Sequence, residues 1–87
     1  MSPPEHSPRP AATLDAMQPG QRATVAALEG DDLLVSRLLE MGLLEGTPVE
    51  FVRRAPLGDP LEIRINGRYN LSLRRADARL IEIKPAD

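Results

Sequence analysis

The side chains that could take part in catalysis or metal binding are few in this chain of 87 residues, and they do not group together. The single histidine, His6, lies in a proline-rich N-terminal segment, and one imidazole does not make a metal site. The four serines lie in the same segment or at outward positions of predicted elements, with no base beside them. The chain has no cysteine, so disulfides and cysteine-ligated zinc are also excluded. We therefore expect no catalytic residue, no metal ligand and no cofactor.

Carboxylates are more numerous, but their positions favour structural roles. Asp31 and Asp32 stand at the predicted start of a helix, where a carboxylate satisfies free backbone N–H groups. Glu62 and Glu82 alternate with apolar neighbours and are expected to point outward from strands. The glycines are scattered and do not gather before a helix, which argues against a phosphate-binding loop. The sequence therefore favours a binding module over an enzyme.

The charge and the aromatic content argue against nucleic acid as a partner. The formal net charge is −2, from 11 basic and 13 acidic residues, and the aromatic residues are Phe51 and Tyr69 alone. Single-strand binders need a basic groove with aromatic stacking platforms. The pairs Arg53-Arg54 and Arg74-Arg75 are expected to be solvated, with the first pair protecting an exposed strand edge.

The hydropathy pattern gives no sign of a membrane span or of an export signal. No apolar run approaches the ~20 residues that cross a bilayer, and the N-terminus lacks the basic-then-apolar layout of a signal peptide. We expect a cytoplasmic protein without direct membrane insertion.

The chain divides into a tail and one small domain. Residues 1–12 contain four prolines and almost no side chain to bury, which predicts a disordered tail. Residues 13–87 carry the periodic patterns of a folded domain. We expect a turn over 14–17, strands over 21–28, 48–54, 61–65, 69–73 and 80–83, a helix of about ten residues starting at 31 or 32, and a helical turn over 74–78.

Glycines and prolines mark the ends of these elements. Gly42 follows the helical stripe, where a left-handed residue ends a helix, and Asn66-Gly67 is typical of a type I′ hairpin turn. Together they predict a mainly β fold: a small, partly open SH3-like barrel of about five strands with one short α-helix after the first strand. An OB-fold is the nearest rival, but it places its helix between the third and fourth strands, where this chain has only Asn66-Gly67.

The remaining candidate for function is an apolar surface at the helix end and at the corner over 55–60. Leucines are more frequent there than the core stripe of the helix needs, although the same residues could simply close one end of the barrel. The candidate partner-binding residues are Leu39, Met41, Leu43, Leu57 and Asp59.

The chain from Leu14 to Ile83 resembles the FeoA family of bacterial ferrous-iron uptake. The resemblance rests on Met41-Gly42-Leu43 with Gly46, on Pro56-Leu57-Gly58-Asp59-Pro60, and on Leu73-Arg74 with Ala78. The residues expected to carry the structural motif are Gly42, Gly46, Pro56, Gly58, Pro60, Asn66, Gly67, Arg74 and Ala78.

The resemblance implies an SH3-like barrel and a non-enzymatic accessory role. The implied partner is FeoB, the membrane transporter of ferrous iron, whose cytoplasmic side would recruit this protein to the inner face of the plasma membrane. An alternative is a metal- or ligand-sensing regulatory domain, because a related SH3-like domain occurs at the C-terminus of iron-dependent repressors. Such a regulator needs a DNA-binding half, which these 87 residues do not include.

Overall fold

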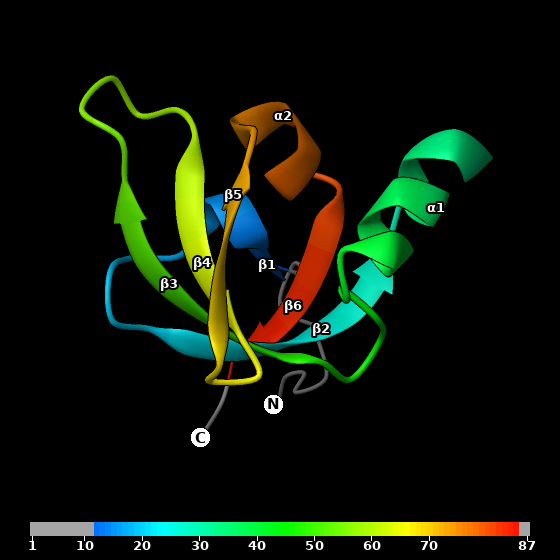
Figure 1. Cartoon of the computed structure of the whole chain (residues 1–87), viewed down its shortest axis with the longest axis horizontal. Coiled ribbons are helices and arrows are strands. Elements are labelled where there is room, and N and C mark those ends of the chain that lie inside the picture. Colours follow the sequence, from blue (N-terminus) through cyan, green and yellow to red (C-terminus); the bar gives the residue numbers. More distant parts are fainter. Residues whose placement is uncertain (1–11, 86–87) are drawn as a thin grey trace, which may run out of the picture.

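The computed structural model of the protein describes residues 12–85, and they form a small curled sheet with two short helices (Figure 1). The predicted tail and His6 lie outside the described residues, except that Ala12 belongs to a strand. In chain order the elements are β1 (Ala12–Thr13), a 3-10 turn η1 (Leu14–Ala16), β2 (Arg22–Leu28), α1 (Asp32–Glu40), β3 (Pro48–Arg54), β4 (Leu61–Ile65), β5 (Tyr69–Leu73), α2 (Arg75–Ala78) and β6 (Ile81–Pro85).

The six strands form one antiparallel sheet in the order β1-β6-β2-β3-β4-β5. The mainly β, SH3-like prediction is confirmed, with α1 inserted after β2, the first long strand. The strand beyond the expected five is the two-residue β1, in which Ala12 pairs with Ile83 and Thr13 with Glu82. Sequence patterns do not reveal β1, because two residues are too few to show an alternation of apolar and polar side chains.

The core is built from the alternating apolar positions of the strands. In β4, Leu61, Ile63 and Ile65 are fully buried, while the residues between them are half-exposed. Phe51 of β3 lies at 0% exposure and is the largest buried side chain. Register shifts after Val25 and after Phe51 mark two bulges, which bend their strands and help a short sheet to curl.

The β4–β5 hairpin has the predicted turn. Asn66 and Gly67 have φ values of 57° and 67°, as the two central residues of a type I′ turn require. The Arg68 N–H closes the turn on the Ile65 carbonyl oxygen at 3.0 Å. Because Ile65 pairs with Tyr69, Arg68 is a third residue in the connection, beyond the two expected from the sequence.

The expectation that Arg53 and Arg54 protect an exposed strand edge needs correction, because β3 lies between β2 and β4. The ladder with β2 nevertheless covers only the first half of β3, from Pro48 to Glu50. Beyond it, the Arg54 guanidinium donates to the carbonyl oxygens of Asp15 and Met17 at 2.9 Å each and lies 4.9 Å from the Phe51 ring centroid. Arg54 thus closes the barrel where the backbone ladder stops.

Candidate partner-binding surface

No catalytic or metal-binding constellation occurs within residues 12–85. No three side chains of the His, Cys, Asp or Glu type lie close enough together there to hold a metal ion. Asp31 serves the role expected from the sequence, since its Oδ1 accepts a hydrogen bond from the Leu34 N–H at 2.9 Å and caps α1. The candidate site predicted from the sequence is an apolar surface in two parts.

The first part of this surface is the helix end, by which we mean residues 29–47: α1, the turns on either side of it and Thr47. One face of α1 is anchored by Leu38, which is 1% exposed. The helix stops at Gly42, whose φ of 97° is strained for any residue with a side chain. The Leu43 N–H then bonds back to the Leu38 carbonyl oxygen at 3.0 Å.

The structure changes one candidate residue of the helix end. Leu43 is 0% exposed and belongs to the core, because the left-handed turn at Gly42 directs the next side chain inward. It cannot contribute to a partner-binding surface in this conformation, and its neighbour Leu44 takes that place at 51% exposure.

Leu44 is held by Thr47, the buried polar side chain among the described residues. The Leu44 N–H donates to Thr47 Oγ1 at 3.0 Å, and that hydroxyl donates in turn to the Gly42 carbonyl oxygen at 3.3 Å. The turn that presents Leu44 is therefore fixed by hydrogen bonds at both ends.

Tyr69 is part of the helix end in space although it belongs to β5. Its hydroxyl lies so close to Gly42 that a Cβ built there would stand 2.6 Å from the oxygen. The Tyr69 side chain is 47% exposed, and Leu39 and Leu44, which flank Gly42 in the sequence, are 42% and 51% exposed. Met41, a candidate contact residue, is partly buried and packs against the core, so only part of its side chain is available here. We call Leu39, Leu44 and Tyr69, together with the exposed part of Met41, the helix-end surface. Leu33, 70% exposed, adds a further apolar side chain on α1.

Sequence reasoning missed Tyr69, Leu33 and Thr47. Leu33 could have been noticed because it falls off the buried stripe of the helix. Tyr69 could not, since its approach to Gly42 joins two elements that are 27 positions apart in the sequence.

The second part of the predicted surface is the loop end, by which we mean Ala55–Pro60 together with residues 74–79. The loop is a tight corner, with the Gly58 N–H donating to the Ala55 carbonyl oxygen at 2.7 Å and the Ala55 N–H to that of Pro60 at 3.0 Å. The Asp59–Pro60 peptide is cis. Leu57 stands at the tip and is 95% exposed, so of the two alternatives left by the sequence it does not close the end of the barrel.

Asp59 and the residues around α2 fasten the loop. Asp59 Oδ1 accepts a hydrogen bond from the Arg75 N–H at 2.9 Å, which gives this candidate contact residue a structural role. Ala78 is buried at 0% exposure, whereas Arg74 and Arg75 are exposed. Pro56 and Pro60 are exposed, and Gly58 has a φ of 88°, the conformation expected of a turn glycine.

The structure does not bring the two parts of the predicted surface together. In Figure 1 the loop between β3 and β4 lies at the upper left, next to α2 at the top, while α1 lies at the right edge of the molecule. Leu57 is therefore remote from the helix-end surface, and the expected single patch is two separate surfaces.

The two surfaces also differ in charge. The helix end carries five carboxylates against one arginine; these residues are Glu29, Asp31, Asp32, Glu40, Glu45 and Arg37. The loop end and the adjoining ends of β3 and β4 carry five arginines against three carboxylates; these are Arg53, Arg54, Arg74, Arg75, Arg79, Asp59, Glu62 and Asp77.

The pKa values of two carboxyl groups, one near each end, are shifted in opposite directions. A hydrogen bond from Arg53 Nε at 2.8 Å lowers the pKa of Glu62, and Asn70 Nδ2 donates to the same carboxylate at 2.7 Å. A hydrogen bond shared with Glu29 raises the pKa of Glu82, because β2 and β6 place these two carboxyl groups side by side.

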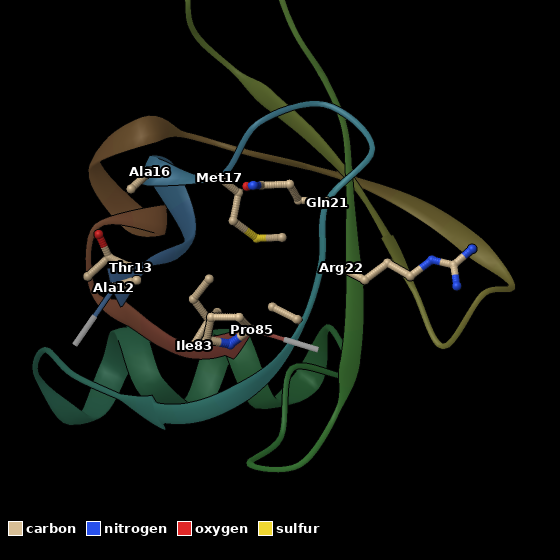
Figure 2. A pocket seen from close by; sticks show the side chains of 9 residues that line it. Ala12, Thr13, Ala16, Met17, Gln21, Arg22, Ile83 and Pro85 are labelled. Carbon is tan, nitrogen blue, oxygen red and sulfur yellow. The ribbon is translucent and has the colours of Figure 1, made fainter. Parts of the chain in front are cut away.

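A hollow of about 300 Å³ lies between β1, η1, β2 and β6. Figure 2 shows the Met17 side chain directed into it and Ile83 and Pro85 on its opposite wall, while Arg22 points away. Among the lining residues that the structure describes, Arg22 is the ionisable one, and its side chain is directed away from the hollow.

The fold defines a small SH3-like barrel with two distinct exposed surfaces. The model of the FeoA domain matches residues 12–85, and the chain therefore belongs to the FeoA family, whose members are accessory domains of iron transport.

Three relatives illustrate this membership. The chain is 41% identical over 71 residues to an Fe(2+) transport protein A/Fe(2+) transporter FeoB fusion protein of Porphyromonas gingivalis, and the match covers 82% of this chain and 8% of the fusion protein. The FeoA protein of Chlorobium tepidum is 33% identical, with a TM-score of 0.80 over 87% of this chain and 71% of that one. Stenotrophomonas maltophilia FeoA in complex with zinc, described as a prokaryotic SH3 domain protein, is 27% identical, with a TM-score of 0.72 over 85% and 91%.

A more distant likeness concerns the fold alone. A manganese-dependent transcriptional repressor shares 18% identity and a TM-score of 0.82 over 92% of this chain and 39% of the repressor.

Proposed function

We propose that this protein is a non-enzymatic accessory module of bacterial ferrous iron uptake that supports a FeoB-type transporter through protein–protein contact. The observation that carries the proposal is the Porphyromonas gingivalis relative, in which a FeoA unit and FeoB are parts of one polypeptide. Two units in one chain work at high effective concentration, so even a weak contact between them is populated. A separate FeoA chain needs a surface that makes the contact without this help.

The helix-end surface is the best candidate for that contact. It groups several large apolar side chains over neighbouring elements, and Thr47 and Tyr69 fix the turn that presents them. Fixed apolar side chains lose little conformational freedom on binding, which favours affinity. The carboxylates around them would select a partner surface with basic residues.

We place the module on the cytoplasmic side, at the inner face of the plasma membrane when the transporter is bound. Within residues 12–85 no helix is long and apolar enough to cross a membrane. Recruitment would then depend on contacts such as those of the helix end.

The test is co-purification with the cytoplasmic part of the FeoB transporter from the same organism. The double variant Leu39→Asp/Leu44→Asp should reduce capture at least about tenfold, because it places two carboxylates where the complex would bury apolar side chains. Both side chains are partly exposed in the free protein, so the variant should fold, which circular dichroism checks.

Leu57→Asp is the control, since it replaces an exposed leucine by a carboxylate at the loop end and adds one negative charge where the double variant adds two. Unchanged capture by Leu57→Asp together with loss by the double variant supports the helix-end contact. Capture that survives the double variant and fails with Leu57→Asp overturns it and assigns the contact to the loop end.

The alternative, a metal- or ligand-sensing regulatory domain, has less support. The likeness to the repressor stands at 18% identity and concerns the fold alone. Calorimetric titration with Fe²⁺ and with Mn²⁺ separates the two functions. Micromolar binding would favour sensing, and an absence of heat would favour the accessory role.

A further inference from the structure

The loop end presents one apolar side chain on a rigid, projecting corner. Leu57 is 95% exposed, and the other large apolar side chains that are exposed among residues 12–85 are Leu33, Leu39, Leu44 and Tyr69, all of the helix end. The corner is held by its backbone hydrogen bonds and by Asp59, so Leu57 cannot fold back onto the barrel without breaking them. A single exposed leucine is common on protein surfaces, but this one is rigidly presented and has exposed arginines beside it.

Arginines surround this corner. The hydrogen bond between Asp59 Oδ1 and the Arg75 N–H places the start of α2 against the loop, and Arg74 and Arg75 are both exposed there. Figure 1 shows the loop and α2 along the same edge of the molecule. Glu62 pairs with Arg53, so these two side chains add no net charge. Beyond them, Arg74, Arg75 and Arg79 outnumber Asp59 and Asp77.

We propose that the loop end is a peripheral contact site for an anionic membrane surface. In this contact the Leu57 side chain enters the headgroup region, and the guanidinium groups of Arg74 and Arg75 meet lipid phosphates. The contact lies at the surface of the bilayer and does not span it. It therefore agrees with the expectation, drawn from the sequence, that no segment crosses the membrane.

The shape and the charge of the two ends favour a lipid surface over a protein partner here. A protein interface needs an apolar core of several side chains, which the helix end offers and the loop end does not. A single leucine among arginines suits an anionic bilayer, where the apolar group and the cations are satisfied at different depths. The acidic helix end would be repelled by the same bilayer, so the molecule would bind in one orientation.

The inference does not depend on the proposed function, because lipid vesicles contain no transporter. The experiment is sedimentation of the full chain with vesicles of phosphatidylcholine containing phosphatidylglycerol, at low salt. We expect binding that is lost in vesicles of phosphatidylcholine alone and in high salt.

Substitutions at the loop end should weaken this binding by predictable factors. One arginine near an anionic surface strengthens binding about fivefold, so Arg74→Gln/Arg75→Gln should weaken it about thirty-fold. Leu57→Ser should weaken it about tenfold, since an apolar side chain no longer leaves water. Both changes are at exposed positions, and thermal melting verifies the fold.

The chain offers matched controls at the other end. Arg37→Gln and Leu44→Ser remove the same groups from the helix end and should leave vesicle binding within about twofold of the unsubstituted protein. Equal loss from the controls would overturn the proposal, as would wild-type binding by Arg74→Gln/Arg75→Gln. Retention on immobilised polyglutamate without any vesicle binding would also overturn it and would assign the loop end to an acidic protein segment.

Discussion

The helix end and the loop end both expose leucines, yet they are built and charged in opposite ways. At the helix end several apolar side chains lie among carboxylates, on a turn fixed by the contacts of Gly42, Thr47 and Tyr69. At the loop end one leucine stands among arginines, on a corner fixed mainly by backbone hydrogen bonds. The difference shows that one small barrel presents two exposed surfaces of unlike charge and construction, and the two contacts proposed above follow from it.

The contrast between the glycines of the two ends gives the largest predicted effect. Gly42 and Gly58 have similar φ values of 97° and 88°, but a Cβ would meet the Tyr69 hydroxyl only at Gly42. Backbone strain should cost about 2 kcal/mol at each site, and the displacement of Tyr69 adds about 1 kcal/mol for Gly42→Ala. Urea denaturation of Gly42→Ala and Gly58→Ala measures both free energies of unfolding.

Repeating the substitution in a Tyr69→Phe protein measures the effect of the close approach between the Tyr69 hydroxyl and Gly42. Without the hydroxyl, Gly42→Ala should lose only as much stability as Gly58→Ala, because strain is then the shared cause. If the two glycine substitutions cost the same in the presence of Tyr69, the close contact does not hold the helix end together.

The next effect concerns how the loop end joins the barrel. Arg54→Met removes two charge-assisted hydrogen bonds to the carbonyl oxygens of Asp15 and Met17, and we expect a loss of about 2 kcal/mol in urea denaturation. Arg53→Met is the matched control, since the Arg53 side chain is 75% exposed and its ion pair with Glu62 should contribute at most about 0.5 kcal/mol. Equal losses would mean that Arg54 does not close the barrel.

A smaller effect tests the start of the helix end. Asp31→Ala removes the acceptor for the Leu34 N–H and should destabilise the protein by about 1 kcal/mol. Asp32→Ala, one residue inside α1, removes the same charge without the capping bond and should cost less than half of that. Thermal unfolding followed by circular dichroism compares them, and the reverse order would contradict the assignment of Asp31 as the cap.

The smallest effects compare the shifted carboxylates under acid. The pKa of Glu62 is lowered from 4.5, so this group stabilises the fold above pH 4.5, and its contribution is lost as pH falls through the lowered value. The pKa of Glu82 is raised from 4.5, so its ionised form destabilises the fold at neutral pH and the penalty disappears on acidification. Glu82→Gln should therefore stabilise the protein at pH 7, whereas Glu62→Gln should destabilise it.

Denaturation at pH 7 and at pH values below 4.5 measures both effects. The two variants should differ at neutral pH and converge towards the unsubstituted protein in acid, where the glutamates are themselves neutral. A destabilising Glu82→Gln would show that its pairing with Glu29 is favourable instead.

Much of the fold could be predicted because local rules and tertiary packing agree in this chain. The alternation in Leu61, Ile63 and Ile65 and the turn at Asn66-Gly67 each fix a strand or its end without distant contacts. The tight corner around Leu57 followed from the same kind of rule, since the prolines leave it little freedom, but the sequence left open whether Leu57 is exposed there or closes the barrel.

The arrangement of the surface could not be predicted to the same degree. Leu43 and Leu44 are adjacent leucines, and only the turn at Gly42 decides that the first is buried and the second exposed. The curl of the sheet determines two further features. It separates Leu57 from the helix end, and it brings Arg54 within hydrogen-bond distance of the Asp15 carbonyl oxygen in η1. No pattern within a strand or helix carries that information.

The pairing of β1 with β6 has a consequence for how this domain can be joined to other chains. Ala12 lies directly opposite Ile83, so the polypeptide enters and leaves the barrel on neighbouring strands, at the same side. A domain with adjacent ends can be fused to a longer polypeptide through either end without a change in its strand order. A circular permutant that joins residue 85 to residue 12 through a few glycines, and opens elsewhere, should fold to the same barrel.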